Sequence, residues 1–175
     1  MNVLSIEIKT SIDNPEKIEA ILKAKGAKYV GEDHQIDTYF LVDSGRLKLR
    51  QGKIENSLIL YHRPESKDLK KSSVQLQKLS SDNEALKEIL TKTIGVRTVV
   101  DKKRKIFFIE NVKFHIDEVK GLGAFMEIEA LDTEGIFSEK KLQEQCDFYI
   151  DFLKLDRSKF INQSYSEMVG DNQNL

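Results

Sequence analysis

The chain is 175 residues long, 39% of its residues are hydrophobic, and 28 lysine and arginine residues stand against 29 acidic residues, a net charge of −1. This length suits one domain with its own hydrophobic core, so we expect a single domain over residues 1–169 and a polar tail over residues 170–175. The balanced charge excludes the overall basic surface that nucleic-acid binding usually needs.

Cysteine content and hydropathy indicate the cellular compartment in which the protein is expected. The only cysteine, Cys146, excludes an intrachain disulfide framework. No apolar run approaches the length of a membrane span, and the N-terminus lacks the pattern of a signal peptide. We therefore expect a soluble cytoplasmic protein that binds neither nucleic acid nor membrane, and a homodimer remains open.

The first part of the chain predicts four strands and one helix. Residues 3–9 alternate between apolar and polar side chains, which is typical of a strand with one charged face. Asp13-Asn14-Pro15-Glu16 combines a helix cap with a proline at the first helical position, and Gly26 is a stop signal. The next strands are predicted over residues 35–42, 46–50 and 57–63.

The middle of the chain is less regular. Residues 64–73 form the most polar internal stretch, typical of a mobile surface loop, and a lid is one role open to it. A strand is predicted over residues 74–79. Ser81-Asp82 then caps a helix that ends at Gly95.

The last part predicts a long strand over residues 98–109, followed by a hairpin of two short strands that ends near Ala130. Apolar residues then recur at helical spacing over residues 142–153. Eight strands joined mostly by short turns predict an α+β fold with an antiparallel sheet. Such a sheet can close into an eight-stranded β-barrel with helices packed outside.

The polar faces of these strands carry a recurring set of charges. Alternation assigns seven basic and four acidic residues to them: Glu7, Lys9, Arg46, Lys48, Arg50, Arg63, Lys102, Arg104, Asp117, Glu127 and Glu129. An ordinary solvated outer surface is one interpretation. The other is a charged barrel interior, which would require water, metal and a polyanion such as a triphosphate to offset desolvation.

Several of these runs together resemble the successive motifs of the CYTH superfamily, the triphosphate tunnel metalloenzymes. The motifs are Glu7-Ile8-Lys9, Gln35–Phe40, Arg46–Arg50, Tyr61–Pro64, Val100–Arg104 and Asp117–Glu129. The likeness is greatest to the class IV adenylate cyclase-like branch and runs from about residue 3 to Val169. It implies an eight-stranded triphosphate tunnel and a reaction at a triphosphate that depends on Mg²⁺ or Mn²⁺.

The resemblance also implies roles for single residues. It assigns Glu7, Asp117, Glu127 and Glu129 to the metal. It assigns phosphate binding to seven cations, Lys9, Arg46, Lys48, Arg50, Arg63, Lys102 and Arg104. Lys9, Arg104 and Asp117 are expected to act in catalysis. The chain departs from the family's Glu-x-Glu-x-Lys signature at its first glutamate, where Ser5 stands.

Three functions fit this resemblance. A class IV adenylate cyclase-like enzyme would convert ATP to cyclic AMP and pyrophosphate. A triphosphatase would hydrolyse thiamine triphosphate, a nucleoside triphosphate or inorganic tripolyphosphate. A non-catalytic module would bind polyphosphate or a nucleotide without turnover.

Other chemically interesting residues favour structural roles. Gly121-Leu122-Gly123 fits a tight hairpin turn better than a dinucleotide-binding loop. His34, His62 and His115 lie on separate segments, so each is expected to be structural or exposed. Cys146 falls in the apolar stripe of a helix and is expected in the core.

Overall fold

A computed structural model describes residues 4–62, 73–80 and 83–173. One sheet contains all of its strands: β1 (Leu4–Ser11), β2 (Lys28–Phe40), β3 (Arg46–Gln51), β4 (Ser57–His62), β5 (Ser73–Lys78), β6 (Val96–Ile109), β7 (Val112–Val119) and β8 (Gly123–Asp132). The helices are α1 (Pro15–Ala24), α2 (Glu84–Ile94), α3 (Glu139–Phe152) and α4 (Tyr165–Gln173), with a short 3₁₀ turn, η1 (Arg157–Lys159), before α4.

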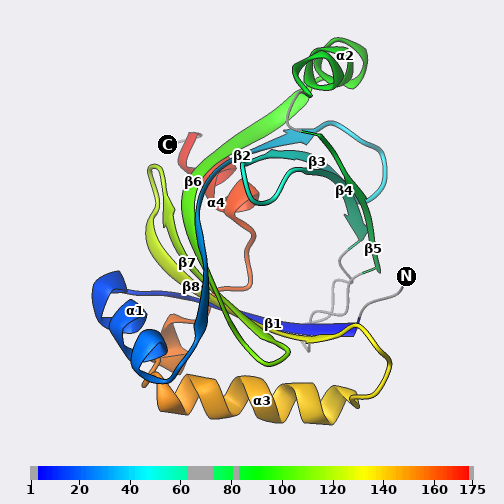
Figure 1. Cartoon of the computed structure of the whole chain (residues 1–175). Helices are drawn as coiled ribbons and strands as arrows, with labels where there is room; N and C mark the ends of the chain where they lie inside the picture. Colours follow the sequence, from blue (N-terminus) through cyan, green and yellow to red (C-terminus); the bar gives the residue numbers. More distant parts are fainter. Residues whose placement is uncertain (1–3, 63–72, 81–82, 174–175) are drawn as a thin grey trace.

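The sheet is antiparallel throughout and has the strand order β1-β8-β7-β6-β2-β3-β4-β5. It curls around a central space, with β1 and β5 at its two edges (Figure 1). Within the described ranges no strand pairing joins these edges. The predicted α+β fold with eight antiparallel strands and helices outside is confirmed, as a curled sheet in the manner of a triphosphate tunnel.

The elements differ from expectation mainly in their ends. β2 begins at Lys28 instead of residue 35 and ends at Phe40. The first part of β2 was not predicted, because its inward-facing side chains are polar and the apolar alternation typical of a strand is therefore missing. α2 follows Asn83, while the expected cap Ser81-Asp82 lies outside the described residues, as does most of the expected loop 64–73. α4 extends to Gln173 and so takes in part of the expected polar tail.

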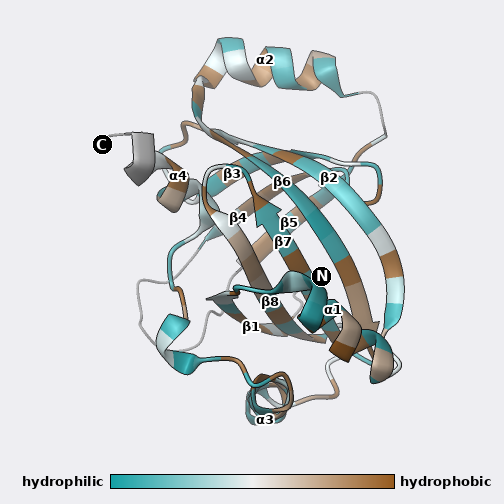
Figure 2. Ribbon diagram, turned by 90° about the vertical axis from the view of Figure 1, so that its left-hand side faces the viewer, coloured by the Kyte–Doolittle hydropathy of each residue, from teal (hydrophilic) through white to brown (hydrophobic). Residues whose placement is uncertain are grey.

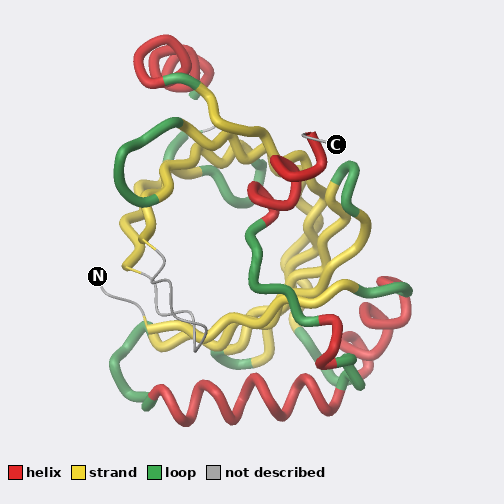
Figure 3. The backbone as a smooth tube through the Cα atoms, turned by 180° about the vertical axis from the view of Figure 1, so that it is seen from behind, coloured by secondary structure: helices red, strands yellow, loops and turns green. Residues whose placement is uncertain are grey.

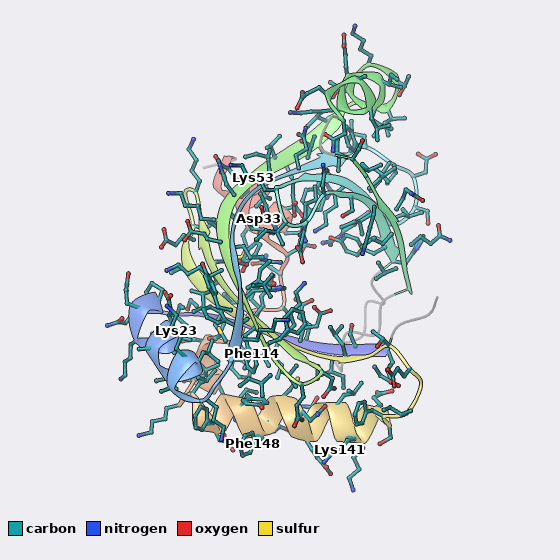
Figure 4. All side chains as sticks on the ribbon, in the orientation of Figure 1. Lys23, Asp33, Lys53, Phe114, Lys141 and Phe148 are labelled. Atoms are coloured by element: carbon teal, nitrogen blue, oxygen red, sulfur yellow. The ribbon has the colours of Figure 1, made fainter. Side chains whose placement is uncertain are left out.

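The main hydrophobic core lies on the outer face of the sheet. α1 and α3 cover the part made by β1, β6, β7 and β8 (Figure 1), and hydrophilic and hydrophobic residues alternate along the strands (Figure 2). Phe114 points from β7 toward α3 (Figure 4), where its ring packs edge-on against Tyr149 at 4.9 Å between centroids. Cys146 is fully buried, as expected, and its Sγ donates to the Ile6 carbonyl. This packing turns the polar strand faces inward.

The C-terminal segment closes part of one rim of the curled sheet (Figure 3). Thr10 and Phe160 form an isolated β-bridge, and the Ile161 amide donates to the Lys9 carbonyl at 2.9 Å. The start of α4 places Tyr165 in a second core cluster on the inner side of the sheet. Residues far apart in sequence therefore meet at this rim.

α2 stands apart from the rest of the molecule (Figure 1). None of its residues is buried. In the part of the chain that the structure describes, no helix has both the length and the apolar character needed to cross a membrane.

Candidate active site

The curled sheet encloses a cavity of about 900 Å³. It is lined by most of the charged residues that strand alternation brought together: Glu7, Lys9, Lys48, Arg50, Lys102, Arg104, Glu127 and Glu129. Of the two interpretations of these faces, the structure supports the charged interior. Groups that are spread over the sequence from β1 to β8 therefore line one cavity.

Three other predicted site residues are placed differently. Asp117 is fully buried in the wall behind the cavity, where it pairs with Arg104. Arg46 points to the C-terminal segment, where its guanidinium donates to Ser164 Oγ at 2.7 Å and to the Glu167 carboxylate. Arg63 lies outside the described residues.

Arg104 is the centre of one buried charge network. Its Nε donates to Asp117 Oδ1 at 2.6 Å. Its Nη2 donates to Asp117 Oδ2 at 2.5 Å and to Glu127 Oε2 at 2.7 Å. Burial opposes the charge, but these two carboxylates raise the pKa of Arg104 well above its usual value. Tyr165 completes the network, because its hydroxyl donates to Asp117 Oδ2 at 2.8 Å. The guanidinium is thus fixed in place.

Asp37 is the centre of a second network that the sequence analysis left without a role. Arg50 donates to both of its oxygens, at 2.8 and 2.9 Å, and Lys48 and Lys102 lie 3.1 and 3.2 Å from Oδ2. Burial opposes its charge, but Arg50, Lys102 and Lys48 hold the pKa of this carboxyl well below its usual range. One acid therefore gathers three cations on one side of the cavity.

Lys102 carries the most strongly perturbed amine of the site. Burial disfavours its charged form, Arg104 beside it adds repulsion, and the pKa of the ammonium falls to about 7. An added anion in the cavity would restore its full charge. The arrangement therefore favours binding of a negatively charged group.

Lys9 links the cavity to the C-terminal segment. Its Nζ lies 3.5 Å from Glu127 Oε1 and 4.1 Å from the centroid of the Tyr165 ring, and it donates to the Gln163 carbonyl at 3.2 Å. The side chain is almost completely buried. Its ammonium group is held at the rim where β1 and the segment before α4 meet.

Glu7 and Glu129 form the acidic part of the cavity. They are directly opposite each other on neighbouring strands β1 and β8. Burial, followed by repulsion from Glu7, raises the pKa of the Glu129 carboxyl to about 7. A divalent cation between these oxygen ligands would relieve that repulsion, so the pair fits Mg²⁺ or Mn²⁺.

The other two predicted metal ligands, Glu127 and Asp117, form ion pairs with cations of the site. Glu127 bonds to Arg104 and lies near Lys9, and Asp117 is held by Arg104. Across the described ranges, no group of three or more histidine, cysteine, aspartate or glutamate side chains is arranged to hold a metal ion. Ser5, at the position of the family's first glutamate, lines the same cavity opposite Leu131. The fit to a metal thus rests on Glu7 and Glu129.

His115 also belongs to the site, although it was expected to be structural or exposed. It lines the cavity, with Nδ1 3.1 Å from Glu127 Oε2, and its Nε2 is buried without a hydrogen-bond partner among the described residues. Burial and the neighbouring Arg104 lower the pKa of the imidazole to about 4. His34 and His62 are exposed, as expected. Strand alternation could have found His115, because it shares a face with Asp117.

Glu55, in the loop between β3 and β4, was also missed. Its carboxylate accepts from Arg50 Nη1 at 2.7 Å and from Lys113 Nζ at 2.5 Å, and both cations lower its pKa although burial opposes this. Lys113 lines the cavity from β7. No pattern in the loop sequence signals this contact, because the partners come from distant strands.

The loop is held in position by Asp33. This fully buried carboxylate accepts from the backbone amides of Lys53, Ile54 and Glu55 at 2.7, 3.1 and 2.9 Å. Asp33 and Lys53 lie close together inside the curl of β2 (Figure 4). Only Gly52 permits this approach, since a Cβ atom there would lie 2.5 Å from Asp33 Oδ2.

We expect Gly52→Ala to lower the free energy of unfolding by about 1–3 kcal/mol, because the added methyl group overpacks this contact. Gly170→Ala is the matched control. A Cβ atom at Gly170, within α4, meets nothing within 4 Å, so that variant should gain about 0.5–1 kcal/mol. Urea unfolding followed by circular dichroism measures both. Equal stability of wild type and Gly52→Ala would show that Asp33 does not hold the loop this closely.

Comparison with protein-family models shows the family to which this chain belongs. The family model described as CYTH domain matches residues 4–146, most of the chain. The chain belongs to the CYTH domain family. A Methanocaldococcus jannaschii protein named as a proposed adenylate cyclase is 27% identical over 179 residues, which cover 96% of this chain and 99% of that protein.

Solved structures with lower identity show the same CYTH fold. The PH1012 protein of Pyrococcus horikoshii superposes with a TM-score of 0.81 at 22% identity, over 94% of this chain and 98% of its own. A Hippeastrum protein, described as a proposed adenylyl cyclase with a dominant triphosphatase activity, superposes with a TM-score of 0.67 at 15% identity. That alignment covers 98% of this chain and 97% of the other.

Proposed function

We propose that the protein is a metal-dependent enzyme that acts on the triphosphate group of a nucleotide, with the reaction of a class IV adenylate cyclase. The observation that carries the proposal is the cavity inside the curled sheet, which is lined by Lys48, Arg50, Lys102 and Arg104 together with Glu7 and Glu129. Proteins with a CYTH domain generally act on triphosphates. The named relative from Methanocaldococcus jannaschii supports the cyclase in particular.

In this proposal the cations bind the phosphates. The fork of Arg50 and the point charges of Lys48 and Lys102 would bind phosphate oxygens, while Asp37 keeps the three side chains together. Lys9 and Arg104 would stabilise charge at the reacting phosphorus, and Asp117 would orient Arg104. Arg46 and Arg63 remain proposed phosphate-binding residues at the rim and outside the described part.

The proposed metal ligands are Glu7 and Glu129. Glu127 and Asp117, which the family resemblance also assigns to the metal, would act through Arg104. A bound Mg²⁺ or Mn²⁺ would neutralise phosphate charge and favour loss of the proton from the attacking hydroxyl. Ser5 in place of a glutamate removes one carboxylate from this group.

The reaction itself is an exchange at the α-phosphorus of ATP. The ribose 3′-oxygen forms a bond to this phosphorus and loses its proton to water. The bond from the same phosphorus to the bridging oxygen breaks, and pyrophosphate leaves with the electron pair. The fixed cations of the cavity stabilise the charge that develops on the leaving group.

A triphosphatase is the second candidate. It would use the same cavity, but water would attack the terminal phosphorus and orthophosphate would leave. The specific observation in its favour is the fold shared with the Hippeastrum protein, whose described activity is dominantly that of a triphosphatase.

The deciding experiment is product analysis of the purified protein with Mg²⁺ or Mn²⁺ and, separately, ATP, thiamine triphosphate and tripolyphosphate. We expect cyclic AMP and pyrophosphate in equal amounts from ATP. Orthophosphate without cyclic AMP would replace the cyclase by the triphosphatase. Tight binding without turnover of any of the three would leave a binding module as the function.

A further inference from the structure

The last part of the chain reaches the active site, although the family model does not include it. The CYTH domain model ends at residue 146, and the C-terminal segment, defined as residues 157–173 from η1 to α4, follows it. This segment runs along one rim of the curled sheet (Figure 3). Ser164 and Tyr165 line the cavity. The segment therefore contributes side chains to the site to which the family match assigns no role.

Tyr165 contacts two of the predicted catalytic residues at once. The Nζ atom of Lys9 lies 4.1 Å from the centroid of the Tyr165 ring, and the Tyr165 hydroxyl donates to Asp117 Oδ2 at 2.8 Å. Burial and the nearby carboxylates of Glu127 and Asp117 raise the pKa of this hydroxyl well above its usual value, so it stays protonated as a donor. Because Asp117 holds Arg104, Tyr165 links the two cations that are proposed to act at the reacting phosphorus.

The ammonium group of Lys9 is held largely by the C-terminal segment. Glu127 is its partner from the sheet, at 3.5 Å, whereas the Gln163 carbonyl and the Tyr165 ring reach it from the segment. The backbone is tied in the same way, since the Ile161 amide donates to the Lys9 carbonyl at 2.9 Å. A lysine stem is flexible, so the contacts at its end determine where the charge lies.

The start of α4 is itself anchored to the sheet. Ser164 and Glu167 form a capping box, in which the Ser164 amide donates to Glu167 Oε2 at 2.6 Å and the Glu167 amide donates to Ser164 Oγ at 3.4 Å. Arg46 from β3 donates to both side chains. The ring of Phe125 from β8 packs against the Tyr165 ring, with 5.2 Å between centroids. Tyr165 is thus fixed in place from two strands.

We propose that Tyr165 is a positioning residue of the active site, whose ring holds the Lys9 ammonium and whose hydroxyl holds Asp117, and through it Arg104, at the reacting phosphorus. This inference rests on the proposed function and adds to it a residue outside the family model. A misplacement of about 1 Å in such a site can reduce the rate by about 100-fold. A role in packing alone is the other interpretation, because Tyr165 also contacts Phe125.

The test is steady-state turnover of the triphosphate that the wild type converts fastest. Tyr165→Leu keeps an apolar side chain against Phe125 but removes the ring and the hydroxyl, so we expect kcat to fall by about 10- to 100-fold. KM should stay within about twofold, since Asp37 holds the proposed phosphate-binding cations in place. Tyr165→Phe keeps the ring next to Lys9, so its kcat should fall by about fivefold or less.

Tyr149→Phe is the matched control. Tyr149 is 8% exposed and Tyr165 is 5% exposed, but Tyr149 packs against Phe114 on the outer face of the sheet. Loss of its hydroxyl should change neither kcat nor KM. A second measurement needs no turnover: the ring current of Tyr165 should shift the NMR resonance of the Lys9 ε-protons upfield. This shift should persist in Tyr165→Phe and disappear in Tyr165→Leu.

The alternative results contradict different statements. If Tyr165→Leu is less stable but keeps the wild-type kcat, or if the Lys9 resonance does not move in that variant, Tyr165 is only a packing residue and the inference is wrong. An equal loss of kcat in both Tyr165 variants would contradict the role of the ring, and a raised KM with unchanged kcat would contradict positioning. If the wild type turned over no triphosphate while the Lys9 resonance responded as expected, the proposed reaction would be wrong, whereas the placement of Lys9 by Tyr165 would be supported.

Discussion

Arg104→Ala is expected to lower the free energy of unfolding by about 3–5 kcal/mol, because the change leaves Asp117 buried without its cation and leaves Lys9 as the remaining cation beside Glu127. For a chain of this size that loss corresponds to roughly 10 °C in Tm. Turnover should disappear as well, since the same guanidinium faces the cavity. Differential scanning calorimetry measures the first effect, and product analysis measures the second.

Two further variants separate charge from geometry at this position. Arg104→Lys keeps the charge but cannot donate from a fork to Asp117 and Glu127 together, so it should recover part of the stability and little of the turnover. Arg97→Ala removes an exposed arginine from the same strand and should change neither. If Arg104→Ala were as stable as Arg97→Ala, the buried network would not exist in solution.

Glu129→Gln is expected to reduce turnover by at least about 100-fold if Glu129 has its proposed role, because a metal ion held there would supply several kcal/mol of charge stabilisation. Unlike Arg104→Ala, this variant should not be less stable than wild type. Burial and repulsion from Glu7 already disfavour the charged form of the Glu129 carboxyl, so a neutral amide in its place costs no stability. Activity and stability should therefore move in different directions.

The pH dependence of stability tests the same carboxyl. Its pKa is raised from 4.5 to about 7 on folding, so the folded state binds more protons than the unfolded state between these values. Wild type therefore loses stability through Glu129 as the pH rises from about 4.5 to 7. The advantage of Glu129→Gln should be absent near pH 4.5 and reach on the order of 1 kcal/mol at pH 8, after allowance for the partial exposure of the side chain.

Metal addition provides the complementary readout. Mg²⁺ or Mn²⁺ should raise the Tm of wild type at pH 8 and have a smaller effect on Glu129→Gln, because binding to the folded state stabilises it. Glu118→Gln is the control, since Glu118 is exposed on the other face of β7. If the metal raised the Tm of Glu129→Gln as much as that of wild type, the ion would bind away from Glu7 and Glu129.

The sequence determined which residues face the inside of the sheet. Side chains alternate along every strand, so the polar positions of β1, β3, β6 and β8 could be assigned to one face without knowledge of the pairing. The apolar positions of the same strands, together with the stripe around Cys146, required helices on the opposite face. The CYTH motifs then indicated that the charged face is the interior.

Only the tertiary structure decided which charges neutralise one another. Asp37 gathers Lys48, Arg50 and Lys102 because β2 lies between β3 and β6, an order that the sequence does not state. Glu55 reaches Arg50 because Asp33 holds a loop that has no sequence pattern of its own.

The same limit applies to Tyr165 and to the metal ligands. Tyr165 reaches Asp117 from the other end of the chain, across a contact between the C-terminal segment and the rim of the sheet. Asp117 and Glu127 had been grouped with Glu7 and Glu129, but Arg104 holds the first two and leaves the second pair facing each other. Alternation fixes the face on which a side chain lies, whereas its partner depends on strand order, register and distant loops, which long-range packing determines.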